Sequence, residues 1–359
     1  MNTVLCCILP RRLLQTKCSL ININVCKCPC TIKERCLSNT GMKEPDAVVT
    51  TNLIENEDAD KNAICTFGVL TDVHYADIQD GTNYSKTRRR YYRKSLSLVE
   101  AALSEWRRST HILSFILQLG DLVDEHNVIF GKETIEAALR KVLTVFSTAP
   151  APVYHVWGNH DFYNFTRSYL LASPEMNART VHLSAGTPAE VELSAKNFFK
   201  STCPASESAA YFHFSPTKGY RIVVLDQYEV SMLGLPSSCA EYQLAQEMLQ
   251  QQNRNSDLNS PLGLRGLNAR FVQFNGAVST TQLEWLRDVL NEAQMNEEIV
   301  LVAGNLSVWA RAFADYRFLM HDIYVVISYF KPHSLESGQF TGFFEWVFFL
   351  LCRSSSGLR

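Results

Sequence analysis

The sequence lacks any apolar run of the ~18 to 20 residues that a helix needs to cross a membrane. The nearest approach is GFFEWVFFLL, residues 342–351, which is short and carries Glu345. We therefore expect a soluble protein without a membrane partner. With 359 residues, of which 46% are apolar and 19% charged, the chain can bury a sizeable core as one large domain or two small ones.

The sequence also has no excess of one charge, because its formal net charge is −2. Such a balance gives no general attraction to nucleic acid. The one basic run is Arg88 to Arg90, which is either the solvated start of a helix or a group that faces phosphate. We expect a monomer with no nucleic-acid partner.

Cysteine is sparse outside the first 36 residues, which hold seven of the eleven cysteines. The other four are scattered and do not form a disulfide framework, as in a reduced, cytoplasmic protein: Cys65, Cys203, Cys239 and Cys352. The CKCPC run lacks the paired C-x-x-C spacing of a zinc knuckle. A cytoplasmic location is therefore predicted.

Acidic residues are scarce at the N-terminus, where six Lys and Arg residues precede position 36 against the single acid Glu34. A basic leader poor in acids is typical of a mitochondrial transit peptide, but serine is sparse here. We expect residues 1–62 to be a disordered, cysteine-rich leader ending in an acidic linker. A mitochondrial leader is the alternative.

Three apolar runs in the middle of the chain each end in side chains that bind metals. FGVLTDVH ends in Asp72 and His74, ILQLGD ends in Asp121, and VYHVWGNH ends in Asn159 and His160. Open α/β sheets place their ligands at the carboxyl ends of strands, so three such ends can direct their side chains into one cavity. The sequence therefore predicts a two-metal hydrolase.

Amphipathic segments separate these runs. Apolar residues at steps of three and four predict helices within 87–106 and over 132–146. Residues 220–227 and 299–305 are predicted to be further buried strands. Alternating strands and helices indicate an α/β domain with parallel pairing.

The segment between these last two strands is less regular. Residues 231–278 are predicted to be rich in loops, with NSPLGL as a turn cluster. A helix is then predicted from Ser279, which forms a capping-box signature with Gln282 three residues later. This helix is expected to bury Leu283, Leu286 and Leu290.

The donors suggest a division of roles. Asp72 and His74 can reach one ion together, Asp121 can bridge two ions, and Asn159 offers an amide oxygen to the second. Such donors suit Mn, Mg, Zn or Fe. Two ions about 3.5–4 Å apart can generate a hydroxide and neutralise charge during in-line attack on phosphorus. His160 could protonate the departing oxygen, because its pKa lies near working pH.

Neighbouring polar residues have plainer interpretations. Asp124 and Asp161 are predicted to cap or orient nearby groups, and His155 to be a buried strand residue. The FYNFTRSY segment could stack on a nucleobase and direct Arg167 to a phosphate. The alternative, which we favour, is that its aromatic rings form the core beneath a loop-rich cover.

The strings D-x-H, G-D-x-x-D and G-N-H-[DE] together resemble the signature of the calcineurin-like metallophosphoesterases. Longer segments narrow the resemblance to the manganese-dependent ADP-ribose/CDP-alcohol diphosphatases of that family: DGTNYSKTRRRYYRKSL, WGNHDFYNFTRSYL, DLNSPLGL and FVQFNGAVSTTQLEWL. The resemblance covers roughly residues 65–303. It implies a four-layer α/β/β/α sandwich over residues 63–305.

The resemblance also implies an activity and a site. It implies hydrolysis of ADP-ribose to AMP and ribose 5-phosphate, and of CDP-alcohols such as CDP-choline to CMP and phosphocholine. By position, Asp72 and His74 would bind the first of two divalent ions, Asp121 would bridge them, Asn159 would bind the second, and His160 would act in catalysis. The implied partner is a small nucleotide diphosphate, and the implied metal is manganese.

The sequence departs from the family after residue 305. The family pattern requires a strand that ends in His, and later a G-H-x-H, whereas Asn305 follows IVLVAG and no G-H-x-H occurs. Neither His321 nor His333 follows a glycine. Residues 306–359 are therefore predicted to be a divergent tail that leaves the C-terminal part of the fold incomplete. A catalytically impaired variant without the later histidines and a different metallophosphoesterase stay open as alternatives.

Overall fold

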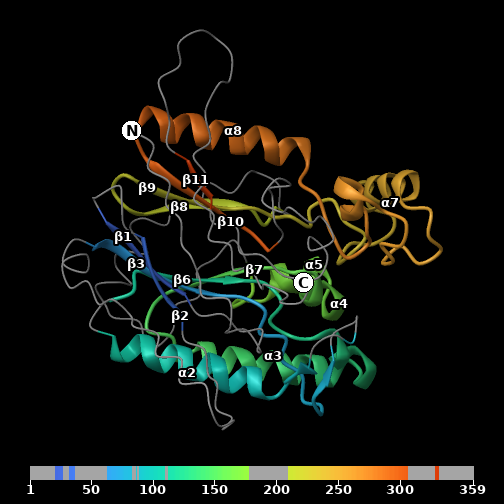
Figure 1. The fold of residues 1–359 in the computed structure, drawn as a ribbon, viewed down its shortest axis with the longest axis horizontal. Helices are drawn as coiled ribbons and strands as arrows, with labels where there is room; N and C mark the ends of the chain where they lie inside the picture. The colour runs from blue at the N-terminus through green and yellow to red at the C-terminus, as the bar shows by residue number, and fades with distance from the viewer. Residues whose placement is uncertain are drawn as a thin grey trace, which may run out of the picture.

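The computed structural model describes residues 21–26, 32–36, 63–82, 86, 89–109, 112–177, 209–305 and 328–330. These residues form two large β-sheets with helices on their outer faces (Figure 1). From one side to the other, the layers are helix α8, the sheet β11-β10-β9-β8, the sheet β2-β1-β3-β6-β7, and helices α2 and α3. The predicted α/β/β/α sandwich is confirmed.

The first sheet has a parallel centre, formed by β3 (Ala63–Leu70), β6 (Phe115–Leu119) and β7 (Val153–Val156). Every side chain of β6 and β7 is buried, as expected for strands covered on both faces. Because the three strands run the same way, their carboxyl ends meet at one edge of the sheet.

Two further strands extend this sheet on the other side of β3. They are β1 (Ile21–Cys26), which pairs antiparallel with β3, and β2 (Ile32–Cys36), which pairs antiparallel with β1. Both fall within residues 1–62, the segment predicted to be a leader. The alternation of Ile and Val with Asn in ININV has the two-residue period of a strand. The rest of residues 1–62 lies outside the described residues.

Helices α2 (Lys94–Arg108) and α3 (Lys132–Phe146) cover the outer face of the first sheet (Figure 1). The prediction for α3 is confirmed over its full length. Helix α2 starts at Lys94, later than predicted, because Arg89 and Arg90 form β5 (Arg89–Arg90), which pairs with β4 (Gly81–Thr82) in a short hairpin.

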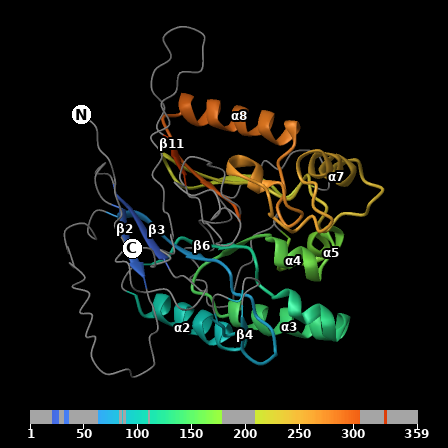
Figure 2. The same cartoon turned by 45° about the vertical axis from the view of Figure 1, so that its right-hand side comes forward.

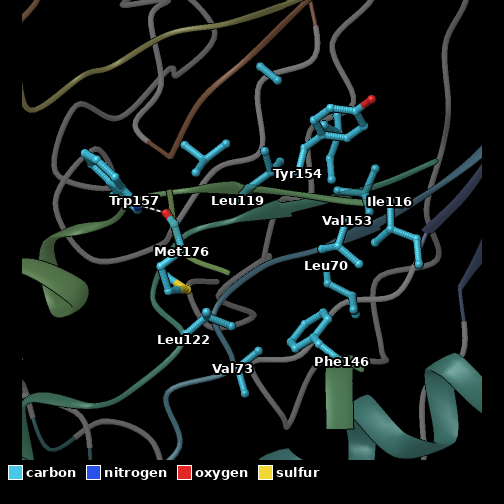
Figure 3. Packing of buried hydrophobic residues seen from close by; sticks show 14 of the residues in the cluster. Leu70, Val73, Ile116, Leu119, Leu122, Phe146, Val153, Tyr154, Trp157 and Met176 are labelled. Atoms are coloured by element: carbon cyan, nitrogen blue, oxygen red, sulfur yellow. Dashed lines mark hydrogen bonds between the residues drawn. The ribbon is translucent and has the colours of Figure 1, made fainter. Parts of the chain in front are cut away.

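The core lies on both faces of the first sheet. In Figure 3, Leu70, Ile116 and Val153 lie together with Phe146 of α3 on the helix side. Tyr154, the next residue along β7, stacks at 4.2 Å between centroids on Phe214 of β8 in the second sheet. Adjacent residues of β7 therefore join the sheet to the helices on one face and to the second sheet on the other.

The second sheet is formed by β8 (Phe212–Thr217), β9 (Tyr220–Val224), β10 (Ile299–Ala303) and β11 (Ser328–Phe330). Strands β9 and β10 are parallel and confirm the two predicted strands. Strand β11 lies in the predicted tail and pairs antiparallel with β10. The remaining residues of that tail lie outside the described residues.

Helix α8 (Thr280–Met295) covers the second sheet and begins as predicted, because the Ser279 side chain accepts the Gln282 backbone N–H at 3.0 Å. The prediction of which residues form its apolar face is partly wrong. Leu286 and Leu290 pack against the sheet, but Leu283 is 52% exposed. Gln282 is buried instead, since its amide bonds to both the N–H and the carbonyl of Asp226.

The segment predicted to be rich in loops contains a helix, α7 (Ala240–Gln252), and a 3-10 turn, η2 (Gly266–Arg270). Helix α7 buries only Ala245 and Leu249, so its sequence carries a weak apolar period. Among the described residues, no helix is both long and apolar enough to cross a bilayer.

Candidate metal centre

The carboxyl end of the first sheet carries the predicted donors. The loops after β3 and β6 run side by side, since Asp72 N donates to the Gly120 carbonyl at 3.2 Å and His74 N to the Asp121 carbonyl at 2.8 Å. Asp72, His74 and Asp121 all have left-handed backbone conformations, with φ of 59°, 45° and 59°. Non-glycine residues rarely adopt this conformation, and such strain is typical of functional sites.

Asp72, His74 and Asp121 come together in a buried cluster. His74 Nε2 lies 2.9 Å from Asp72 Oδ1 and 3.5 Å from Asp121 Oδ2. Asp121 is completely buried, and its Oδ2 accepts no hydrogen bond from any residue in the described part of the chain. A buried carboxylate oxygen is costly to leave without a partner. Two carboxylates and an imidazole within this reach could hold a divalent ion, and an oxygen that accepts no hydrogen bond fits that use.

The pKa of Asp121 is shifted in the direction that a neighbouring cation would oppose. Burial is the main cause that raises the pKa of Asp121 to about 7; His74 opposes the rise, and the negative charge of Asp72 adds to it. A divalent ion next to the carboxylate would favour its charged form.

Asp124 lies on the other side of His74, and its Oδ2 is 3.2 Å from His74 Nδ1. The same oxygen accepts from Arg90 Nη1 at 2.9 Å, while Oδ1 contacts His126 Nδ1 at 2.5 Å and accepts the His126 N–H. Although burial raises its pKa, hydrogen bonds from His126 and His74 hold the pKa of Asp124 well below its usual value. Asp124 also caps the 3-10 turn η1 (Glu125–Phe130), which confirms the predicted capping role.

Asp161 ties the loops of the centre together. Its carboxylate accepts the backbone N–H groups of Asp121 at 2.7 Å, Leu122 at 2.9 Å and Gly158 at 2.9 Å. The side chain is completely buried, and its prediction as an orienting group is confirmed.

His160 and Asn159 begin helix α4 (Asn159–Asn164), which with α5 (Arg167–Ala172) lies between α7 and α3 (Figure 2). The His160 backbone N–H donates to Asp121 Oδ1 at 2.9 Å, and its ring meets the His74 ring edge-on at 4.2 Å between centroids. His160 Nδ1 accepts the Glu125 N–H at 3.3 Å. His160 is therefore brought beside the buried cluster.

Asn159 is the first residue of that helix. Its backbone N–H donates to the hydroxyl of Tyr228, and its side chain is hydrogen-bonded to the hydroxyl of Tyr163. Asn159 thus lies next to His160, with its amide partnered by a tyrosine.

Asn305 follows β10 and reaches the same region from the second sheet. Its Nδ2 donates to the Leu119 carbonyl at 2.9 Å, and its Oδ1 accepts from the Tyr228 hydroxyl at 3.2 Å. A Cβ on Gly158 would lie 2.7 Å from Asn305 Nδ2 and 2.2 Å from Asp121 Oδ1, so glycine is required there for the close approach. His321 and His333 lie outside the described residues.

Sequence reasoning missed part of this arrangement. Arg90 is neither a solvated helix residue nor free to meet a phosphate, since its guanidinium is bound to Asp124. Arg167 is buried and bonded through two nitrogens to Asp226, so the idea that it meets a phosphate is wrong. Phe162 and Phe165 are buried, as the core interpretation predicted, and so is His155, whose Nδ1 contacts the Gln118 amide.

Comparison with known proteins identifies the family. The calcineurin-like phosphoesterase family matches residues 65–328 of this chain. The chain belongs to this family. The match continues past Asn305, beyond the segment in which the motifs were found.

Relatives in this family carry a more specific name. The manganese-dependent ADP-ribose/CDP-alcohol diphosphatase of Mus musculus is 37% identical over 261 residues, which cover 72% of each chain. The protein of the same name from Homo sapiens is 35% identical over 282 residues, covering 76% of this chain and 78% of its own. A crystal structure of a dimetal phosphatase from Danio rerio is 37% identical, with a TM-score of 0.57, and the match covers 68% of this chain and 71% of that one.

Proposed function

We propose that this chain is a metal-dependent hydrolase that cleaves the diphosphate bond of ADP-ribose and of CDP-alcohols such as CDP-choline. The observation that carries the proposal is the buried cluster of Asp72, His74 and Asp121, in which Asp121 Oδ2 accepts no hydrogen bond from any described residue. The substrate class is inferred from the names of relatives that are 35% and 37% identical to this chain.

Each donor has a role in the proposal. Asp72 and His74 hold the first divalent ion, Asp121 is shared by two ions, and Asn159 binds the second. The ions, manganese by the names of the relatives, supply the positive charge that activates a water molecule and stabilises an in-line attack on phosphorus.

His160 supplies the proton for the departing phosphate oxygen. The ring would give up this proton from Nε2 in its imidazolium form, and Asp124 Oδ2, 3.6 Å from His160 Nδ1, would stabilise the positive charge of that form. The products are AMP and ribose 5-phosphate from ADP-ribose, and CMP and phosphocholine from CDP-choline.

The proposal is tested by hydrolysis of ADP-ribose and CDP-choline by the full chain with Mn²⁺. Turnover is expected to stop on chelation and to return when Mn²⁺ is added. The Asp121→Asn variant should lose turnover. The Asp77→Asn variant should keep turnover, because it changes a carboxylate that is half exposed on the surface. Wild-type turnover no greater than that of Asp121→Asn contradicts the proposal. A phosphomonoester and a cyclic nucleotide, run beside these substrates, test for a different phosphoesterase.

A second candidate is a catalytically impaired variant of this enzyme. It is favoured by Asn305, a neutral amide where the family has an imidazole, with both ends of the amide already hydrogen-bonded. The Asn305→His variant tests it, with Asn305→Gln as the control. A gain of Mn²⁺ affinity and turnover in the histidine variant alone supports impairment, and equal turnover in wild type and Asn305→His contradicts it.

A further inference from the structure

We propose that Arg90 and His126, here called the Asp124 clamp, are positioning residues that fix the His74 imidazole for metal binding. The inference rests on the proposed function of the cluster. It assigns a role to the arginine run that precedes α2 and to a histidine on the η1 turn, neither of which touches the proposed metal donors.

The clamp acts on both oxygens of one carboxylate. Arg90 Nη1 donates to Asp124 Oδ2 at 2.9 Å, and His126 contacts Oδ1 through its ring Nδ1 at 2.5 Å and its backbone N–H at 3.1 Å. With a partner on each oxygen, the carboxylate cannot rotate without breaking a hydrogen bond. Its Oδ2 is thereby held 3.2 Å from His74 Nδ1.

The fixed carboxylate determines which nitrogen of His74 is available. His74 Nε2 is hydrogen-bonded to Asp72 Oδ1, and a metal ion that replaced the proton of this bond would leave the ring proton on Nδ1, facing Asp124. On the Nε2 side of the ring, Asp72 Oδ1 lies at 2.9 Å and Asp121 Oδ2 at 3.5 Å. The ring nitrogen that does not bind metal commonly donates to a carboxylate, and loss of such an outer group costs about 10–100-fold in metal affinity or activity.

Tyr92 joins the two halves of the clamp. Its hydroxyl is hydrogen-bonded to Arg90, and its ring lies 5.2 Å from the His126 ring between centroids. Tyr92 is buried, so these contacts are shielded from water. The β4–β5 hairpin and the η1 turn are therefore connected directly behind His74.

This geometry fits a positioning role of Arg90 better than a direct role in binding substrate. Its side chain is only 13% exposed, and Nη1 is already bonded to a buried carboxylate. Loss of Arg90 should therefore weaken binding of the metal and leave the KM for substrate at saturating Mn²⁺ nearly unchanged.

The test measures Mn²⁺ binding to the full chain by isothermal titration calorimetry in wild type, Arg90→Met and His126→Phe. Both variants remove a clamp donor, and the Kd for Mn²⁺ is expected to rise about 10–100-fold.

The matched control is Arg93→Met, because Arg93 is 55% exposed and pairs with Asp77 on the surface. Its Kd should stay within about twofold of wild type. Excess Mn²⁺ should restore the turnover of the clamp variants, and Arg90→Lys should fall between wild type and Arg90→Met.

Two results would overturn the proposal. One is an unchanged Kd for Mn²⁺ in folded Arg90→Met and His126→Phe. The other is a raised substrate KM in Arg90→Met that excess Mn²⁺ does not correct, since Arg90 would then hold the substrate. If Arg90→Met fails to fold, Arg90→Lys and Tyr92→Phe decide by the same titration. A wild type that binds Mn²⁺ but hydrolyses neither substrate contradicts the proposed function alone, because the titrations still decide the clamp.

Discussion

The carboxylate of Asp161 accepts the backbone N–H of Asp121 at 2.7 Å. Asp121, in the loop after β6, is thus held by a side chain from the loop and short helix that follow β7. The same carboxylate also accepts the N–H groups of Leu122 and Gly158, and all of these groups are buried. The two loops are joined at a single side chain.

Replacement of Asp161 by Ala should therefore be strongly destabilising. It leaves three N–H groups without an acceptor, and each such buried group costs about 1–3 kcal/mol. We expect the free energy of unfolding, measured by urea denaturation, to fall by about 3–5 kcal/mol. Asp161→Asn keeps one acceptor oxygen and should lose less. A loss below about 1 kcal/mol in Asp161→Ala would show that other groups hold the loops.

Gly158→Ala should disturb the metal centre rather than the fold. The added Cβ would lie 2.2 Å from Asp121 Oδ1, so the carboxylate has to move. We expect Mn²⁺ affinity to fall at least about tenfold, measured by calorimetry. Gly219→Ala is the control for backbone strain away from the metal centre, because its φ of +84° strains an alanine although nothing lies within 4 Å of the Cβ position. Equal Mn²⁺ affinity in the two variants would mean that the Asp121 carboxylate can move without a loss of metal binding.

Arg221 should matter for stability, although it lies far along the chain from the metal donors. It is buried in β9 and donates to Glu298 at 2.7 Å and to Glu292 at 3.0 Å. Arg221→Met leaves Glu298, which is mostly buried, without this partner, and should cost about 2–4 kcal/mol. Arg287→Met removes a surface pair with Asp288 and should cost under about 1 kcal/mol. Similar urea midpoints for the two variants would count against this view.

His213 should make stability depend on pH. Burial, aided by the nearby charge of Arg221, lowers its pKa from 6.5 to about 4. Between pH 6.5 and pH 4, His213 therefore binds a proton in the unfolded chain but not in the folded chain. The free energy of unfolding consequently falls as pH falls from 6.5 towards 4. In His213→Phe, the urea midpoint should drop less between pH 7.5 and pH 5 than in wild type. Parallel drops in the two proteins would exclude His213 as the source.

Features with a local cause were predictable from the sequence. Helix α3 could be predicted over its full length because its apolar residues follow the helical period without interruption. The cluster of Asp72, His74 and Asp121 was predictable because parallel strands direct their carboxyl ends to one edge.

Features that depend on contacts between distant segments of the chain could not be predicted from the sequence. The burial of Gln282 in place of Leu283 depends on Asp226, which lies 56 residues away. Arg90 is bonded to Asp124 across 34 residues, and no local pattern distinguishes it from the exposed Arg89 beside it. Helix α7 has too few buried residues to give a clear period.

The left-handed backbone at Asp72, His74 and Asp121 has a consequence for the evolution of this chain. Glycine at any of these positions would relieve an unfavourable conformation that costs about 1–3 kcal/mol. It would also delete a metal donor. A lineage released from the need to bind cations would gain robustness by exchanging these side chains for glycine. Acids and an imidazole at three strained positions therefore indicate that the side chains themselves are needed there.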